Sequence, residues 1–280
     1  MIQSYTYNGL GLVSNITYTQ DSTVKESYDY TYDSRGYITT ESILNNYFSA
    51  AKDADFAYTY DTIGRLTASA YTDNTTSTTN TTSYTYDNVG NRLNKSNSQD
   101  TYNYTIGAYN QVSAITKTLT GSSTVVEGTS FSYNTNGDTT QETPIISNGT
   151  LTKNYDYDYT DMMRTAQVGT TTETYVYNGD GQRVKKITGT ETTKYYYTGS
   201  VVLYTADADN YKISGNIATP GGQIIASRDS NLGGDGALYY FYHYDLRGSV
   251  TSILKPDGTL EQGYSYDEFG NVTVEKSAST

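Results

Sequence analysis

The sequence predicts an all-β chain of stacked β-hairpins that form one curved or spiral sheet. A motif of the form Tyr-x-Tyr-Asp-x-x-Gly recurs along its 280 residues. Tyr and Thr, which favour strands, are abundant, whereas the strong helix formers Ala and Leu are scarce. The aromatic set contains 33 Tyr, five Phe and no Trp. Tyrosine rings must therefore supply much of the burial that aliphatic side chains usually provide.

Each copy of the motif, with the segment after it, has the residues expected of one β-hairpin. Residues i and i+2 of a strand share a face, so Tyr-x-Tyr places two rings on one side. Asp or Asn then suits the first position of a turn, where its side chain accepts bonds from the following backbone. Gly supplies the left-handed conformation that closes a three-residue hairpin loop with a bulge. A second alternating segment follows, as after Gly64.

Eleven copies of the hairpin motif can be found. Four are complete, at 30–36, 58–64, 84–90 and 264–270; those at Tyr5, Phe131 and Tyr175 have Asn in place of Asp; those at Tyr102, Tyr155, Tyr195 and Tyr242 are degenerate. The predicted structural repeat positions are Tyr30, Tyr32, Asp33, Gly36, Tyr58, Tyr60, Asp61, Gly64, Tyr84, Tyr86, Asp87, Gly90, Tyr175, Tyr177, Gly181, Tyr242, His243, Asp245, Gly248, Tyr264, Tyr266, Asp267 and Gly270.

A lone hairpin is marginal in water, so the hairpins are expected to stack into one sheet whose twist makes it curl. Residues 1–174 form the hairpin array, and residues 175–280 continue the same sheet without an independent second domain. Between the repeats, residues 43–56 are expected to be a short helical interruption, 72–83 a long turn or polar hairpin, and 222–227 a strand. Turns are expected at 121–128, 144–150, 220–222 and 233–236.

Composition excludes several classes. The chain has no Cys, a net charge of −12 and a pI near 4.4, which argue against disulfides, thiolate metal sites and nucleic-acid partners. It contains no apolar run long enough to span a membrane and opens without a signal peptide.

The sequence predicts no catalytic residue and no cofactor site. His243 is the single histidine; Ser249 and Asp245 could complete a Ser-His-Asp set only on one hairpin with nothing to orient it. Asp156 and Asp158 are a carboxylate pair of the kind that glycosidases use, but such pairs arise by chance in an acidic chain. Asp207 and Asp209 resemble part of a calcium loop without its full pattern, and are the metal candidates.

The chain resembles the YD-repeat, or Rhs, family over essentially its whole length. The Tyr-Asp pairs at Tyr32, Tyr60, Tyr86 and Tyr266 carry the resemblance, and the segment 242–250 matches the family's Tyr-His-x-Asp-x-x-Gly-Ser pattern. This resemblance implies a structural shell of a secreted or cell-surface bacterial protein of the polymorphic-toxin or wall-associated type. Such a shell encapsulates or presents a C-terminal toxin effector, and its partners are that effector and the remainder of the shell.

The family's Asp-Pro and Gly-Gly self-cleavage segment and the effector are absent here, which predicts a fragment or a truncated product. Exposed sheet edges also predict end-to-end self-association. Two alternatives stay open: a cell-surface adhesin or carbohydrate-binding module that contacts glycans through tyrosines, and a glycosidase-like enzyme.

Overall fold

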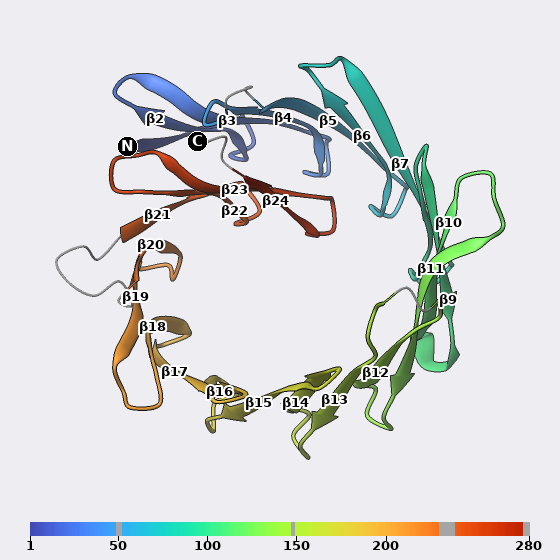
Figure 1. The fold of residues 1–280 in the computed structure, drawn as a ribbon. Helices are drawn as coiled ribbons and strands as arrows, with labels where there is room; N and C mark the ends of the chain where they lie inside the picture. The colour runs from blue at the N-terminus through green and yellow to red at the C-terminus, as the bar shows by residue number, and fades with distance from the viewer. Residues whose placement is uncertain (49–51, 147–148, 230–238, 277–280) are drawn as a thin grey trace. The chain divides into compact units, whose positions relative to one another are not determined.

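The computed structural model describes residues 1–48, 52–146, 149–229 and 239–276. In these ranges the regular structure is 24 strands of one sheet and a single 3₁₀ turn, η1 (Ala108–Asn110) (Figure 1). Strands that follow one another in the chain pair antiparallel, for example β3 with β4 and β15 with β16. The predicted all-β class of stacked hairpins is therefore confirmed. No helix in the described ranges could cross a bilayer.

The chain packs as two compact units. The first contains residues 1–83, 223–228 and 234–280, and the second contains residues 84–222 and 229–233. The organisation predicted from the sequence, 1–174 followed by 175–280, stays a prediction.

The first unit is built from both ends of the chain. Its strands are β1 (Ile2–Tyr7), β2 (Val13–Gln20), β3 (Thr23–Tyr32), β4 (Ile38–Asn45), β5 (Lys52–Tyr60), β6 (Leu66–Asp73), most of β7 (Thr78–Tyr86), β20 (Ile224–Asp229), β21 (Tyr239–Tyr244), β22 (Val250–Leu254), β23 (Leu260–Tyr266) and β24 (Val272–Lys276).

Within the first unit, β21–β24 lie against β1–β5 and form a second layer (Figure 1). The apolar core between the layers consists of Ile16, Tyr18, Tyr28 and Tyr30, and Leu246 of the second layer packs on it. The second layer buries Leu254 and Leu260. This two-layer packing brings together residues more than 200 positions apart, and the repeat pattern does not predict it.

The second unit is a succession of hairpins. Its strands are β8 (Arg92–Ser96), β9 (Asp100–Ile106), β10 (Val112–Leu119), β11 (Val125–Tyr133), β12 (Thr139–Pro144), β13 (Lys153–Tyr157), β14 (Met163–Val168), β15 (Thr171–Tyr177), β16 (Arg183–Thr188), β17 (Glu191–Thr198), β18 (Val201–Ala206) and β19 (Lys212–Ala218).

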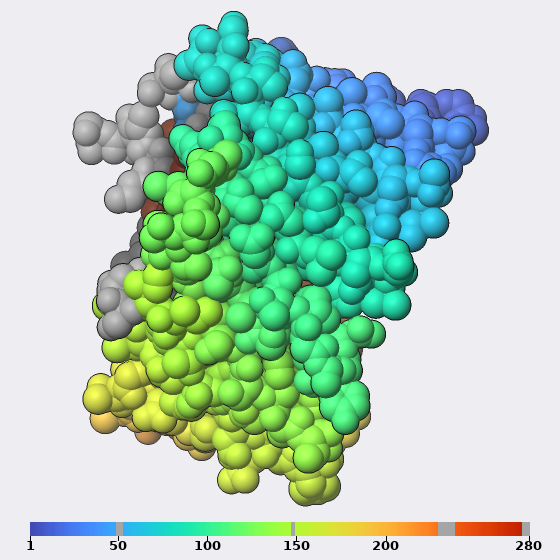
Figure 2. All heavy atoms as spheres, turned by 90° about the vertical axis from the view of Figure 1, so that its right-hand side faces the viewer, coloured from blue at the N-terminus to red at the C-terminus, as the bar shows by residue number. Residues whose placement is uncertain are grey.

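The second unit is thin. Of its described residues, only Tyr84, Thr118, Ala206 and Gly215 are buried. The green-to-yellow part of Figure 2 shows one face of this layer, on which side chains form a continuous covering. Tyrosine rings with a wet hydroxyl end suit a single layer, because they bury apolar area while their polar end stays near water.

The hairpin loops repeat one geometry, which Asp61 illustrates. Its N–H donates to the Arg65 carbonyl at 2.9 Å, and the Gly64 N–H donates to the Asp61 carbonyl at 3.1 Å. Gly64 has a φ of +89°, and the strand register shifts between Thr59 and Tyr60. This is the three-residue loop with a bulge that Asp-x-x-Gly favours.

The expected helix within residues 43–56 is wrong for the described residues. β4 continues to Asn45 and β5 begins at Lys52, and Ile43 pairs with Ala54 across the hairpin. The apolar residues of this segment therefore follow the two-residue period of strands, and Phe56 packs on Tyr71 of the next strand. Residues 49–51 lie outside the described part of the chain.

The other expected connections vary in outcome. Residues 72–83 form a polar hairpin between β6 and β7, and 222–227 lies largely in β20, as predicted. The turn at 220–222 is present, closed by Gly222 donating to the Thr219 carbonyl at 2.9 Å. The turn expected at 121–128 is shorter, because β11 begins at Val125; that expected at 144–150 begins after Pro144, and residues 147–148 lie outside the described chain. The turn predicted at 233–236 also lies outside it.

Glycine substitutions separate backbone strain from steric overlap in these loops. A Cβ at Gly64 would lie 2.4 Å from the Tyr37 hydroxyl, whereas one at Gly90 would meet nothing within 4 Å. Both positions are left-handed, which costs other residues about 1–2 kcal/mol. We expect Gly90→Ala to lose about that amount and Gly64→Ala to lose more, as measured by urea unfolding. The exposed Thr62→Val is the control, and equal midpoints for all three variants would contradict the loop assignment.

Candidate functional site

The loop aspartates cap the backbone of their own hairpins. Asp33 Oδ1 accepts the N–H groups of Arg35 at 2.9 Å and Tyr37 at 3.0 Å. The same two-donor pattern recurs at Asp61, Asp87, Asp267, Asn134 and Asn178, and Asp245 Oδ1 accepts the N–H of Ser249. At Asp61 the Arg65 N–H is the main cause of a pKa below the ordinary value. The loop glycines Gly36, Gly64, Gly90, Gly181, Gly248 and Gly270 all have positive φ.

The two metal candidates form another copy of this loop. Asp207 Oδ1 accepts the N–H groups of Asp209 at 3.0 Å and Tyr211 at 2.8 Å. Asn210, with a φ of +69°, takes the place of the loop glycine. Asp207 therefore has the role of a turn residue, and the described residues contain no group of three His, Cys, Asp or Glu side chains that could hold a metal. This copy does not match the motif, because Asn210 stands at the glycine position and Ala206 at the position of the second tyrosine.

The second tyrosine of the motif connects neighbouring hairpins. Its hydroxyl donates to a backbone carbonyl on the preceding strand, and the acceptor is the second residue after the left-handed loop residue. We call this contact the tyrosine latch. It occurs at Tyr32 (to Val13, 2.5 Å), Tyr60 (to Ile38, 2.8 Å), Tyr133 (to Val112, 2.7 Å), Tyr157 (to Thr139, 2.9 Å), Tyr197 (to Arg183, 2.9 Å), Tyr266 (to Val250, 2.7 Å) and Tyr244 (to Ile224).

The first tyrosines of the motif are placed more variably. Tyr30, Tyr58 and Tyr84 are buried. Tyr175 donates to Glu173 at 2.5 Å, and Tyr242 and Ser227 share a hydrogen bond of the same length. Tyr86, Tyr177 and Tyr264 are half-buried on their strands.

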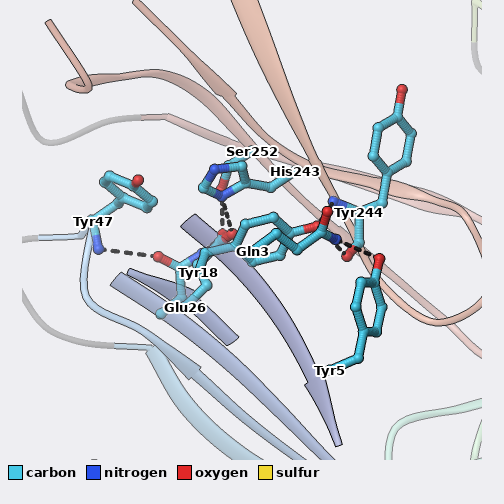
Figure 3. A network of polar contacts seen from close by, with 9 residues as sticks. Gln3, Tyr5, Tyr18, Glu26, Tyr47, His243, Tyr244 and Ser252 are labelled. Carbon is cyan, nitrogen blue, oxygen red and sulfur yellow. Dashed lines mark hydrogen bonds and ion pairs between the residues drawn. The ribbon is translucent and has the colours of Figure 1, made fainter. Parts of the chain in front are cut away.

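A buried carboxylate lies between the two layers of the first unit. Glu26 is fully buried on β3, and Asn45 of β4 donates to its Oε1 at 2.6 Å. Ser252 of β22 donates to the same oxygen, and His243 of β21 contacts Oε2 through Nδ1 at 2.6 Å (Figure 3). Nδ1 carries the proton in this contact, because a carboxylate only accepts.

Two tyrosines lie next to the His243 ring. It stacks on Tyr18, with ring centroids 3.8 Å apart and an interplanar angle of 12°, and Tyr47 lies beside it at 5.9 Å (Figure 3). Its Nε2 is buried and makes no hydrogen bond. Ser252 donates to Glu26 and not to His243, and Ser249 donates its N–H to Asp245. The geometry therefore lacks the order of a Ser-His-carboxylate relay.

A second ion pair lies nearby in the same unit. Arg247 donates to Glu41 Oε2 at 2.9 Å, and its guanidinium lies over the Tyr58 ring. Tyr58 also donates to Glu41 at 2.9 Å. Burial opposes the charge on Arg247, but Glu41, Tyr58 and Asp245 together outweigh it and leave the pKa raised. Burial, and next Glu41, raise the pKa of Tyr58.

The sequence reasoning missed Glu26 and Glu41. Glu26 precedes Tyr28 and Tyr30 in the two-residue period of β3, so it shares their inward face. Glu41 lies directly opposite Tyr30 in the register of β3 and β4. The available signal was a glutamate on the same strand face as the inward tyrosines. The partners of the two glutamates, His243 and Arg247, are too distant in sequence to be inferred.

Fold and site together define a β-hairpin repeat protein with a docked C-terminal layer. No family model matches the chain. Among curated proteins it is similar to the tRNA3(Ser)-specific nuclease WapA of Bacillus spizizenii, with 28% identity over 194 residues, which are 68% of this chain and 8% of that protein.

Solved structures give similarities of lower identity. A TcdB2–TccC3 crystal structure aligns over 99% of this chain and 19% of its own, at 13% identity and a TM-score of 0.40. The Tc holotoxin pore of Photorhabdus luminescens aligns over 96% and 18%, at 13% identity and a TM-score of 0.34. A porin-like protein of Bacteroides uniformis aligns over 89% and 95%, at 14% identity and a TM-score of 0.35. The chain thus spans under a fifth of these toxin chains.

Removing one latch hydroxyl tests the tyrosine latch. Tyr60→Phe keeps the ring and its stacking on Tyr37, whose centroid is 5.2 Å away, but leaves the Ile38 carbonyl without this donor. We expect a loss of about 0.5–1.5 kcal/mol in unfolding free energy. Tyr159→Phe is the matched control, since that residue is 96% exposed. If both variants unfold at the same urea concentration, the latch does not stabilise the sheet.

Tyrosine ionisation gives the chain a defined sensitivity to alkali. Burial and then the bond to Glu142 raise the pKa of Tyr155 to about 12, and burial and then Glu173 raise that of Tyr175 to about 12, from 10.0. A raised folded pKa stabilises the fold fully below pH 10, and this contribution is lost as the pH rises through 12. We expect tyrosinate absorbance at alkaline pH to show a late-titrating group that shrinks in Tyr155→Phe. Titration of every tyrosine of the folded chain near pH 10 would refute this.

Proposed function

We propose that this chain is a wall segment of a toxin-related shell, and that it confines or presents an effector without catalysing a reaction. The observation that carries the proposal is the second unit. It is a run of hairpins with almost no buried residues, joined by tyrosine latches, so it behaves as a thin wall. Enzyme sites usually occupy concave, largely apolar pockets with convergent polar groups.

The single histidine supports the same reading. Its Nδ1 is bonded to Glu26, its ring stacks on Tyr18 and Tyr47 lies beside it, so the contacts around it hold the layers together. The repeat motif and the segment 242–250, which resemble those of the Rhs family, give the wall its assignment to a toxin-related shell. In this proposal the partners are the rest of the shell and an effector, and the protein is secreted or displayed at the cell surface.

Confinement is testable in the protein that the natural gene encodes. We expect the reading frame around this sequence to encode further repeats and an effector domain, and the effector to resist added protease. A variant with three latches removed, Tyr32→Phe, Tyr60→Phe and Tyr133→Phe, should lose that protection, whereas Tyr159→Phe should keep it. A frame without an effector, or an effector cleaved equally fast in all forms, would overturn the proposal. Glycan binding that disappears in Tyr159→Ala would favour an adhesin instead.

The edge of β1 offers a test of end-to-end association. Among the described residues, β1 pairs with β2 on one side, and all six of its residues are exposed, with Ile2 at 68%. An unpaired strand edge is a template for another strand. We expect sedimentation velocity to show association that grows with concentration and weakens in Ile2→Lys. A monodisperse monomer at high concentration would count against it.

A further inference from the structure

The two layers of the first unit meet through polar contacts made by one short segment. We call residues 243–247 the docking segment. Tyr244 donates its N–H to the Tyr18 hydroxyl at 2.8 Å, and that hydroxyl donates to the Tyr244 carbonyl at 3.0 Å. Leu246 donates its N–H to the Tyr30 hydroxyl at 3.3 Å. Together with His243 and Arg247, the segment reaches three successive strands, β2, β3 and β4.

Of the residues in this contact, Glu26 has the strictest need for hydrogen-bonding partners. It is fully buried, and it accepts from Asn45 of its own layer and from His243 and Ser252 of the opposing layer. A buried carboxylate is tolerated only when it is paired and hydrogen-bonded. Two of its three partners are therefore present only when β21 and β22 dock in this one position. Displacement by one strand or one residue would leave the charge buried without them.

A buried ion pair adds little stability relative to apolar side chains of similar size, but it penalises wrong pairings strongly. Tyrosine rings recur from hairpin to hairpin. Contacts with these rings alone would therefore allow the C-terminal layer to dock in more than one register. The Glu41–Arg247 pair lies one strand further along, and its guanidinium is still partly exposed, at 42%. It adds a second point of alignment at lower desolvation cost.

We propose that Glu26 and His243 select the register in which the C-terminal layer, β21–β24, docks on the N-terminal strands. The pair acts as a positioning device: docking in the observed register completes the shell of donors around Glu26, and docking in any other register leaves a buried charge. This inference is independent of the proposed function, since it concerns only contacts within the first unit.

The absence of cysteine in the chain makes the register measurable. Spin labels at Ser34→Cys and Pro256→Cys lie at exposed loop positions of the two layers and outside the docking segment in sequence. The otherwise natural chain should give one narrow distance distribution between the labels. Glu26→Gln and His243→Phe should each broaden it or abolish the native distance. Glu142→Gln, which breaks the ion pair with Lys153 in the other unit, is the matched control and should leave it narrow.

An apolar replacement separates register selection from simple stabilisation. In the variant Glu26→Met, His243→Phe and Ser252→Ala the buried carboxylate at position 26 is gone and only the Glu41–Arg247 pair remains, so the layers should dock again but with more than one label distance. A narrow native distance in this variant, or in Glu26→Gln, would overturn the proposal. Hydrogen exchange of β14–β17 must stay unchanged in all variants. Loss of protection there would show that the pair is needed for folding as a whole, and would also refute a role in register.

Discussion

The tyrosine latch is the interaction on which the sheet depends. Each loop bulge shifts the strand register, and a carbonyl just beyond the bulge needs a donor that the regular ladder does not supply. In seven repeats the hydroxyl of the next repeat's second tyrosine is that donor, and its acceptor always lies two residues after the left-handed loop residue. Ring and hydroxyl thus act together: the ring covers the preceding hairpin and the hydroxyl fixes its position. Phenylalanine would supply only the first of these functions, which accounts for Tyr at these seven positions.

Loop and latch constrain each other. The left-handed residue turns the chain so that the following carbonyl faces the next hairpin, and the Asp or Asn side chain holds the loop by accepting two backbone N–H groups. The loop requires a residue that adopts a positive φ, and this need not be glycine. Asn110, Asp161 and Asn210 occupy the left-handed position in other copies. These residue types tolerate positive φ better than others do. A motif search that insists on Gly therefore misses the copy at Asp207, whereas a search for the conformation finds it.

The sequence predicts those parts of the structure that depend on contacts between residues close together in the chain. The hairpins, their loops and the inward face of Tyr-x-Tyr depend on neighbours within a few residues, and the pattern predicts them. The helix expected at 43–56 is wrong because the apolar residues of this segment belong to two paired strands. Ile43 of β4, for example, lies opposite Ala54 of β5. The second layer could not be predicted, because Glu26 and His243 are 217 residues apart and no local pattern links them. A glutamate on the same strand face as Tyr28 and Tyr30 is unusual, but its position does not indicate which residue pairs with it.

The single histidine takes part in the contact between the layers. A general base needs a ring nitrogen that faces the reacting group, directly or through one water. In His243 one ring nitrogen is bonded to Glu26, the other is buried, and the ring stacks on Tyr18. The flanking residues of the same segment serve the same contact, since Tyr244, Leu246 and Arg247 all bond to the opposing strands. The segment whose pattern looked most like a functional signature is thus the segment that joins the layers. Docking of the two layers therefore gives each of these residues a structural role.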